Sequence, residues 1–259
     1  MHASAQMSAR LDRLAFDSPE YKKAFGTFLK STDQKKKAIA WLRGQLASMP
    51  EREVFLDVGA GSGVITGALA EMFRTTIALE PNRDLRRELE RNCPNASVLR
   101  ETIGGAPLGP AIADFVLCCH VFYYIDRADR LPILRRLLGW VRPGGMLVVV
   151  LQSPRSQCSN FLRSFGGSPE DVSELRDSLR REAEINFEST LTTRESHIDA
   201  ASFEDACAIA QVVLSYGIPD HLEMPTLDEL RTLLDENFRQ PGGGYRISCN
   251  QDFLCLRPR

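Results

Sequence analysis

The residues whose types and spacing most suggest chemistry are three glycines, Gly59, Gly61 and Gly63, with Asp57 just before them. They follow the apolar run Val54–Val58 and precede a helical pattern. Glycine allows the backbone to come close to a ligand, and the N-terminus of a helix carries a partial positive charge. We therefore predict a strand-to-helix turn that binds a nicotinamide dinucleotide, a nucleoside triphosphate or a nucleoside-type cofactor.

The position of the third glycine separates these ligands. The dinucleotide fingerprint G-x-G-x-x-G requires glycine where this sequence has Val64, and a P-loop requires a Gly-Lys-Ser/Thr that does not follow here. Glu80 ends the next apolar run, at a place where a carboxylate accepts both hydroxyls of a ribose. These residues favour a nucleoside such as S-adenosylmethionine. The alternative is a turn without ligand, in which Glu80 caps a helix that starts near Asn82.

Apolar runs of strand length alternate with helical patterns over residues 54–151. A parallel sheet with helices on both faces produces this alternation, so we expect an α/β fold. A turn at Arg142–Gly145 is expected to lead into the last strand of this region. The expected strands are Val54–Val58, Thr76–Glu80, Ala96–Arg100, Phe115–Cys119 and Met146–Leu151, and the expected helices are Gly63–Phe73, Arg83–Asn92 and Ala128–Val141.

Further helical and strand patterns flank this region on both sides. Residues 20–48 predict helices that break at Ser31–Asp33, and residues 169–184 predict a helix capped by Ser168. Two later helices interrupt what would otherwise be a closing pair of strands. In chain order, these elements are a strand at Phe187–Asp199, helices at Phe203–Tyr216 and Thr226–Phe238, and a final strand within residues 245–258.

Composition argues against several other classes of protein. The formal charge is −2 at pH 7, whereas a nucleic-acid-binding surface needs a basic face. No apolar stretch reaches the ~18 residues of a membrane helix, and the first residues lack the apolar core of a signal peptide. Seven cysteines are scattered without a C-x-x-C pair, which argues against zinc and a disulfide framework. We expect a cytoplasmic protein without metal, nucleic-acid partner or membrane partner, and its oligomeric state is open.

The turn and its acidic partner resemble the class I S-adenosylmethionine-dependent methyltransferases. Their acidic residue followed by G-x-G-x-G, their acid at the end of strand two and their turn into strand five all have counterparts here, in that order. The resemblance implies S-adenosylmethionine as cofactor and S-adenosylhomocysteine as product. It also implies a Rossmann-like doubly wound seven-stranded sheet with an N-terminal helical segment and a helical insertion before the last strand. The implied cofactor-binding residues are Asp57, Gly59, Gly61, Gly63, Glu80, Glu101, Thr102 and Cys119.

The segment after the fourth strand, "HVFYYIDR", resembles small-molecule enzymes of the histamine N-methyltransferase type. In that family an acidic residue after Ser-Thr binds the substrate amine, and Asp33 matches it. Tyr123 and Tyr124 match its tyrosine pair, and Asn250 lies near its asparagine in the closing strand. The family has glutamine where this chain has His120. The resemblance implies an acceptor site made of these five residues.

Methyl transfer needs an aligned nucleophile, a free lone pair and exclusion of water. An intrinsic pKa near neutrality suits His120 for the role of a base, while Asp33 could hold a cation, and Tyr123 and Tyr124 could wall the methyl site. The structural alternatives are a core histidine, a helix cap at Asp33 and packing tyrosines.

These observations predict a methyltransferase that acts on a nitrogen of a small molecule. Residues 1–50 would cover the acceptor site, residues 51–199 and 245–259 would form the cofactor-binding core, and residues 200–244 would form a helical lid. A covered site suits a small acceptor. Three alternatives remain open: an O-methyltransferase acting on a metabolite hydroxyl or carboxylate, a protein or RNA methyltransferase, and a non-catalytic cofactor-binding module.

Overall fold

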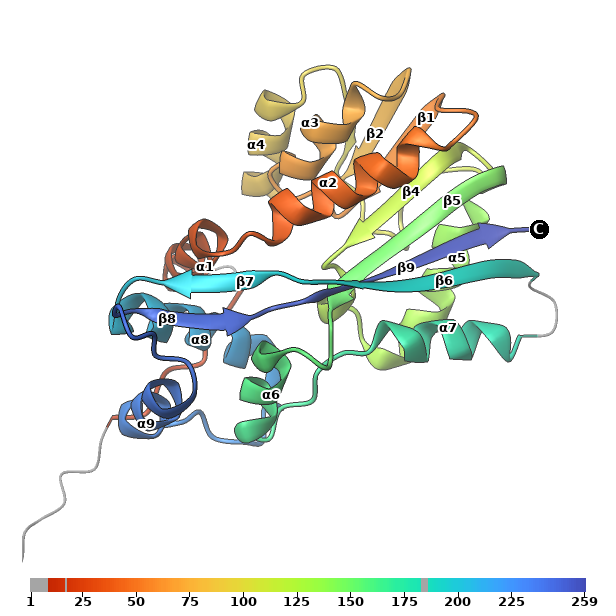
Figure 1. The fold of residues 1–259 in the computed structure, drawn as a ribbon. Coiled ribbons are helices and arrows are strands. Elements are labelled where there is room, and N and C mark those ends of the chain that lie inside the picture. The colour runs from red at the N-terminus through yellow and green to blue at the C-terminus, as the bar shows by residue number, and fades with distance from the viewer. Residues whose placement is uncertain (1–8, 17, 183–185) are drawn as a thin grey trace, which may run out of the picture. The chain divides into compact units, whose positions relative to one another are not determined.

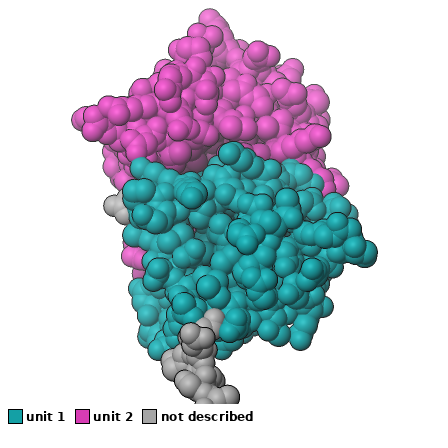
Figure 2. All heavy atoms as spheres, turned by 90° about the vertical axis from the view of Figure 1, so that its left-hand side faces the viewer, with its two compact units in different colours: residues 1–34, 154–169, 195–250 teal, residues 35–153, 170–194, 251–259 magenta. Residues whose placement is uncertain are grey.

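Apolar strand segments alternate with amphipathic helices, and this pattern folds into two compact units (Figure 1). The computed structural model describes residues 9–16, 18–182 and 186–259. We call residues 35–153, 170–194 and 251–259 the sheet unit, and residues 1–34, 154–169 and 195–250 the helical unit; Figure 2 draws them in magenta and teal. Each unit therefore consists of three separate stretches of chain.

The sheet unit contains a seven-stranded sheet with the order β3-β2-β1-β4-β5-β9-β6. The first five of these strands run parallel to one another, and β9 pairs antiparallel with both β5 and β6. This arrangement confirms the predicted Rossmann-like α/β fold. The strands are β1 (Val54–Val58), β2 (Thr75–Leu79), β3 (Ser97–Leu99), β4 (Ala113–Cys119), β5 (Val141–Gln152), β6 (Phe187–Arg194) and β9 (Gln251–Pro258).

Helices cover both faces of this sheet, as the alternating pattern predicted (Figure 1). On one face, Leu42 of α2 and Leu69 of α3 pack with Phe55 and Phe115 from the strands. On the other face, Leu134 of α5 packs with the opposite sides of β1 and β4. The helical segments are α2 (Gln34–Ala47), α3 (Val64–Ala70), α4 (Arg83–Asn92), α5 (Arg130–Gly139), α7 (Val172–Arg180) and the short 3₁₀ turns η1 (Phe122–Tyr124) and η2 (Arg127–Asp129).

The helical unit packs four helices with a two-stranded antiparallel sheet. The predicted break in the N-terminal helices is confirmed, because α1 ends at Ser31 and α2 begins at Gln34. Helices α8 and α9 lie between the two strands of this small sheet in the sequence, as the predicted insertion requires. The elements are α1 (Pro19–Ser31), α6 (Gln157–Ser164), α8 (Phe203–Gly217), α9 (Leu227–Asn237), β7 (His197–Ala200) and β8 (Tyr245–Ser248).

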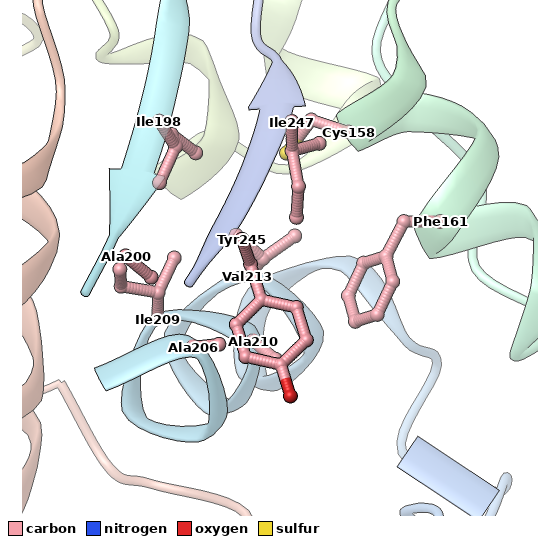
Figure 3. Close-up of a pocket in the computed structure, with 10 residues that line it drawn as sticks. All are labelled: Cys158, Phe161, Ile198, Ala200, Ala206, Ile209, Ala210, Val213, Tyr245 and Ile247. Atoms are coloured by element: carbon pink, nitrogen blue, oxygen red, sulfur yellow. The ribbon is translucent and has the colours of Figure 1, made fainter. Parts of the chain in front are cut away.

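A small apolar cavity of about 10 Å³ lies inside the helical unit, between the two-stranded sheet, α6 and α8 (Figure 3). Aliphatic and aromatic side chains make up most of its wall, among them Phe161, Ile209 and Val213. The hydroxyl of Tyr245 donates a hydrogen bond to Asp235 Oδ1 at 2.7 Å. A space of this size is a packing defect of an ordinary core, because it holds no more than about one water.

Two of the predicted strands are wrong in extent, because each divides into two strands that belong to different units. The segment 187–199 forms β6 and β7, and the segment 245–258 forms β8 and β9. Both breaks are fixed by hydrogen bonds to Ser196: the amide of Cys249 donates to its carbonyl at 2.7 Å, and its own amide donates to Asn250 Oδ1 at 3.2 Å.

Two local predictions also differ from the structure. The segment Arg142–Gly145 belongs to β5, which begins at Val141 and shows a register shift against β4. Gly145 is needed there, since a Cβ on it would lie 2.6 Å from the carbonyl oxygen of Asp114. Helix α7 is capped by Asp171, not by Ser168, because the Asp171 side chain accepts from the amide of Ser173. The predicted end of this helix at Glu184 lies outside the described residues.

Candidate functional site

The glycine turn joins β1 to α3 at the carboxyl end of the sheet. Gly59, Gly61 and Gly63 have φ angles of +71°, +57° and +83°, which side chains strongly disfavour. A Cβ on Gly59 would lie 2.4 Å from Val121 Cγ2, whereas a Cβ on Gly61 would meet nothing within 4 Å. The turn therefore needs glycine for its conformation, and its tip at Gly61 faces open space that a ligand can enter.

Glu80 follows β2 and joins that strand to the glycine turn. Its side chain is 5% exposed, and its two oxygens accept from the amides of Gly61 and Asn82, each at 2.8 Å. Burial raises the pKa of this carboxyl, and the two amide bonds oppose that rise. The cap of α4 comes from Asn82, whose Oδ1 accepts from the amides of Asp84 and Leu85. Each oxygen of Glu80 keeps a lone pair, so the residue fits the recognition of two ribose hydroxyls.

Asp57 supports the turn from inside the protein. It is 2% exposed, and its Oδ2 accepts from the hydroxyl of Thr66 on α3 at 2.6 Å. Burial raises the pKa of Asp57 to about 7, and the nearby carboxylate of Glu80 adds to the rise. The carboxyl is therefore only partly ionised at neutral pH and ties the end of β1 to the following helix.

His120 directly follows β4 and has a φ of +59°, which is rare for any residue other than glycine. Its amide donates to the carbonyl of Val150 at 2.9 Å, and this bond fixes the backbone next to β5. The ring lies within hydrogen-bonding distance of two side chains: Nδ1 is 3.2 Å from the Tyr123 hydroxyl, and Nε2 is 2.8 Å from Gln251 Nε2. A strained residue held from both ring nitrogens is typical of a functional position.

The surroundings of His120 keep its ring neutral. Burial, with a smaller effect from the positive charge of Lys35, lowers the pKa of His120 to about 4. The Tyr123 hydroxyl accepts from the amide of Gln152 at 2.6 Å, and its ring stacks on the imidazole with 5.8 Å between centroids. Tyr124 is 54% exposed.

The remaining predicted cofactor residues lie in the sheet unit but show less specific contacts. Cys119 ends β4 and is half-buried, and burial raises the pKa of its thiol to about 12. Glu101 is also half-buried and pairs with the Arg100 side chain at 3.6 Å. Thr102 is exposed, and its carbonyl accepts from the amides of Gly105 and Ala106 in a turn.

Asp33 and Asn250 belong to the helical unit, where both side chains bind backbone amides. Asp33 Oδ1 accepts from the amide of His197 at 2.8 Å, so the break between α1 and α2 is joined to β7. Asn250 Oδ1 accepts from Ser196, as described above. These bonds give both residues a structural role, and their predicted contact with the acceptor stays a prediction.

Sequence reasoning missed three residues of the site: Lys35, Thr66 and Gln251. Gln251 follows Asn250 directly at the start of β9. Aligning this chain with the closing strand of the histamine N-methyltransferases one position later would have selected Gln251. Thr66 lies nine residues after Asp57, where only the turn brings them together. Lys35 lies in the Lys35–Lys37 run, which resembles a solvated helix face.

Three comparisons with known proteins agree with this geometry. Residues 56–149 match the family described as "Methyltransferase domain". A Mycobacterium tuberculosis protein described as an uncharacterized methyltransferase is 29% identical over 202 residues, which cover 76% of this chain and 77% of that protein.

Two solved structures share the fold at low sequence identity. One, from Bacillus halodurans and assigned as a methyltransferase, has a TM-score of 0.61 and 16% identity and covers 85% of this chain and 99% of its own. The other is a Thermotoga maritima protein described as an S-adenosylmethionine-dependent methyltransferase and possible histamine N-methyltransferase. It has a TM-score of 0.52 and 14% identity and covers 93% of this chain and 95% of its own.

The sheet order defines a Rossmann-like α/β protein, in which the glycine turn lies beside the buried carboxylate of Glu80. The matched domain and the relatives indicate, more narrowly, a methyltransferase. None of the helices in the described part of the chain has the length and apolarity that a membrane crossing needs.

Proposed function

We propose that this protein transfers the methyl group of S-adenosylmethionine to a nitrogen of a small-molecule acceptor. The observation that carries the proposal is the neutral, doubly held imidazole of His120 directly after β4. The next residue, Val121, lies against the glycine turn at Gly59. The reacting atoms of the acceptor would therefore lie next to residues of the cofactor turn.

The cofactor would be held by the turn and by the carboxylates beside it. The open face of Gly61 fits close approach of a ligand, and Glu80 fits the ribose hydroxyls. Glu101 and Thr102 are proposed to lie near the adenine, and Cys119 near the methionine part. When bound, S-adenosylmethionine supplies a methyl group on a positively charged sulfur. The protein's task is then to align the acceptor atom and keep water out.

The state of His120 favours nitrogen over a hydroxyl as the methylated atom. With a pKa of about 4, the imidazole is a weak base at neutral pH. A hydroxyl acceptor needs a base to take its proton, whereas a neutral amine already carries a free lone pair. His120 thus acts as a positioning residue, and an amine that arrives protonated loses its proton to solvent.

Tyrosine contacts suit an acceptor that carries positive charge. The exposed ring of Tyr124 can offer its face to an ammonium group, and Tyr123 holds the histidine in place. Asp33 and Asn250 are further proposed acceptor contacts, by their resemblance to the histamine N-methyltransferases. The Thermotoga maritima protein that shares this fold is described as a possible histamine N-methyltransferase, which is consistent with a nitrogen acceptor.

Calorimetric titration of the purified protein with S-adenosylmethionine and, separately, with NAD tests the cofactor. We expect micromolar binding of S-adenosylmethionine alone. A Glu80→Gln variant should weaken it about 10- to 100-fold, because hydrogen bonds to a charged group are worth about 1.5–3 kcal/mol. Binding of NAD instead, or the absence of any effect in the variant, would contradict the assigned site.

Acceptor chemistry is tested with S-adenosylmethionine labelled with carbon-13 in the methyl group and a panel of small imidazole and aromatic amines and hydroxylated analogues. The carbon shift of the product distinguishes an N-methyl from an O-methyl group. A His120→Asn variant tolerates the left-handed backbone. It should lower turnover about 10- to 100-fold and leave cofactor affinity within about twofold. Products methylated only on oxygen would overturn the nitrogen assignment, and an equal loss of affinity and turnover would overturn the role of His120.

A further inference from the structure

Lys35 is a half-buried cation without a partner. It occupies the first turn of α2, and no hydrogen bond or ion pair joins its ammonium group to any residue in the described part of the chain. Burial lowers the pKa of this lysine, because removing the ammonium group from water disfavours its charged form. Lysine side chains normally keep their charge in water, so a partly buried ammonium group is stabilised when an anion binds beside it.

The position of Lys35 on its helix directs it toward the cofactor turn. Lys35 precedes Ala38 and Leu42 by three and seven residues, so it shares their face of α2. That face packs on Phe55 of β1 and Phe115 of β4, and Lys35 extends it toward the carboxyl ends of the same strands. Figure 1 shows α2 lying along these strands within the sheet unit.

The groups that act electrostatically on Lys35 do not supply a full compensating charge. They are Cys119 at the end of β4, Asp57 at the end of β1 and Glu88 on α4. The thiol of Cys119 is neutral at pH 7, Asp57 is only partly ionised, and Glu88 is exposed to solvent. The surroundings therefore leave a positive charge next to the end of β4, where the methionine part of the cofactor is proposed to lie.

We propose that Lys35 binds the carboxylate of the methionine part of S-adenosylmethionine. This inference rests on the proposed function, because it needs that cofactor in the glycine turn. A flexible ammonium group with three donors is well suited to a carboxylate whose position is set by other contacts. Lys35 then selects cofactor molecules that carry the carboxylate, and Glu80 selects the ribose.

The test compares two ligands that differ in one group: S-adenosylmethionine and its decarboxylated form, which keeps the sulfonium and the amino group. Their dissociation constants are measured by calorimetry for the wild type and for Lys35→Met, Lys35→Arg and Lys36→Met. Lys36 is the matched control, because it is exposed and carries the same charge one position along the helix. Circular dichroism verifies that each variant is folded.

We expect Lys35→Met to weaken S-adenosylmethionine about 10- to 100-fold and the decarboxylated form by less than about threefold. Lys35→Arg should retain most of the preference for the carboxylate, and Lys36→Met should resemble the wild type. Equal weakening of both ligands would overturn the proposal and would mean that Lys35 acts through Asp57. No weakening of either ligand would overturn it as well. A wild type that binds neither ligand would instead overturn the proposed function.

Discussion

The sheet unit and the helical unit bury different kinds of polar side chain. Among the described residues, the buried carboxylates all lie in the sheet unit: Asp57, Glu80, Asp114 and Asp252. The buried polar side chains of the helical unit are neutral, namely Gln34, Ser156, Ser159, Ser196 and Ser215. Several of the latter bind backbone groups; Gln34 Nε2, for example, donates to the carbonyl of Cys249 at 2.9 Å.

Most of these carboxylates support the fold, for example Asp114, which accepts from the amides of Glu53 and Val54, whereas Glu80 lies at the glycine turn. A buried carboxylate is costly unless it is held by donors, and the sheet unit provides them at the ends of its strands. The helical unit has an apolar interior that contains a small cavity. The comparison therefore locates the buried carboxylates, including the proposed ribose contact Glu80, in the sheet unit and leaves the helical unit with a core of ordinary composition.

The largest expected effect concerns the buried charge of Asp57. Its pKa is raised from 3.8 to about 7, so the folded protein binds more protons than the unfolded chain between these values. Its contribution to stability is present at low pH and is lost as the pH rises toward 7. Asp57→Asn removes this effect and keeps an acceptor for Thr66. The free energy of unfolding of the wild type minus that of the variant should fall by about 4 kcal/mol from about pH 3 to about pH 8.

Urea unfolding across this pH range measures the difference. His120 works in the opposite direction, because its lowered pKa makes the folded state lose stability as the pH falls from 6.5 toward 4. Subtracting the variant cancels that contribution, since both proteins contain His120. If the difference in free energy of unfolding stays constant with pH, folding does not raise the pKa of Asp57. The contrast between the interiors of the two units would then weaken.

A smaller effect is expected at the glycine turn. Gly59→Ala introduces a Cβ at 2.4 Å from Val121 in a backbone conformation with φ +71°. Strain and overpacking together should lower the free energy of unfolding by about 2–4 kcal/mol. Denaturant titration measures the loss, and calorimetry should show weaker cofactor binding. A variant with unchanged stability and affinity would contradict the observed turn.

The smallest effect is expected in the helical unit and has the opposite sign. Gly26 lies inside α1, and a Cβ on it meets nothing within 4 Å. Gly26→Ala should therefore raise the free energy of unfolding by about 0.5–1 kcal/mol through its better helix propensity. The same denaturant titration checks it, and cofactor affinity should not change. A loss of affinity would mean that the two units are less distinct in function than their interiors indicate.

Local patterns in the sequence were sufficient for most of the fold. Alternating apolar runs and helical periods located β1, α4 and α8 to within about a residue at each end, because burial on one face sets both periods. The glycine spacing predicted the turn, and the end of the second apolar run predicted the carboxylate of Glu80 that accepts from it. Cap and turn details were less certain, since Asp171 and Ser168 are chemically similar candidates and only the folded backbone decides between them.

Contacts between distant residues could not be read from such patterns. The contact between Gln251 and His120 joins residues 131 positions apart. The surroundings of Lys35 likewise depend on the packing of α2 against β1 and β4. The division of the closing strands depends on Ser196 and its bonds to residues 249 and 250. None of these has a local signature, because each depends on the tertiary fold.

The division of each unit among three stretches of chain has a consequence for synthesis on the ribosome. Strand β9 stands between β5 and β6, so the large sheet stays incomplete until residues 251–258 have emerged. In the helical unit, the amide of Leu14 donates a hydrogen bond to Ser215 Oγ, which lies 201 residues later in the chain. Neither unit can complete its fold before its last stretch, residues 195–250 or 251–259, has emerged, and the exposed edge of β5 needs protection from aggregation until β9 pairs with it.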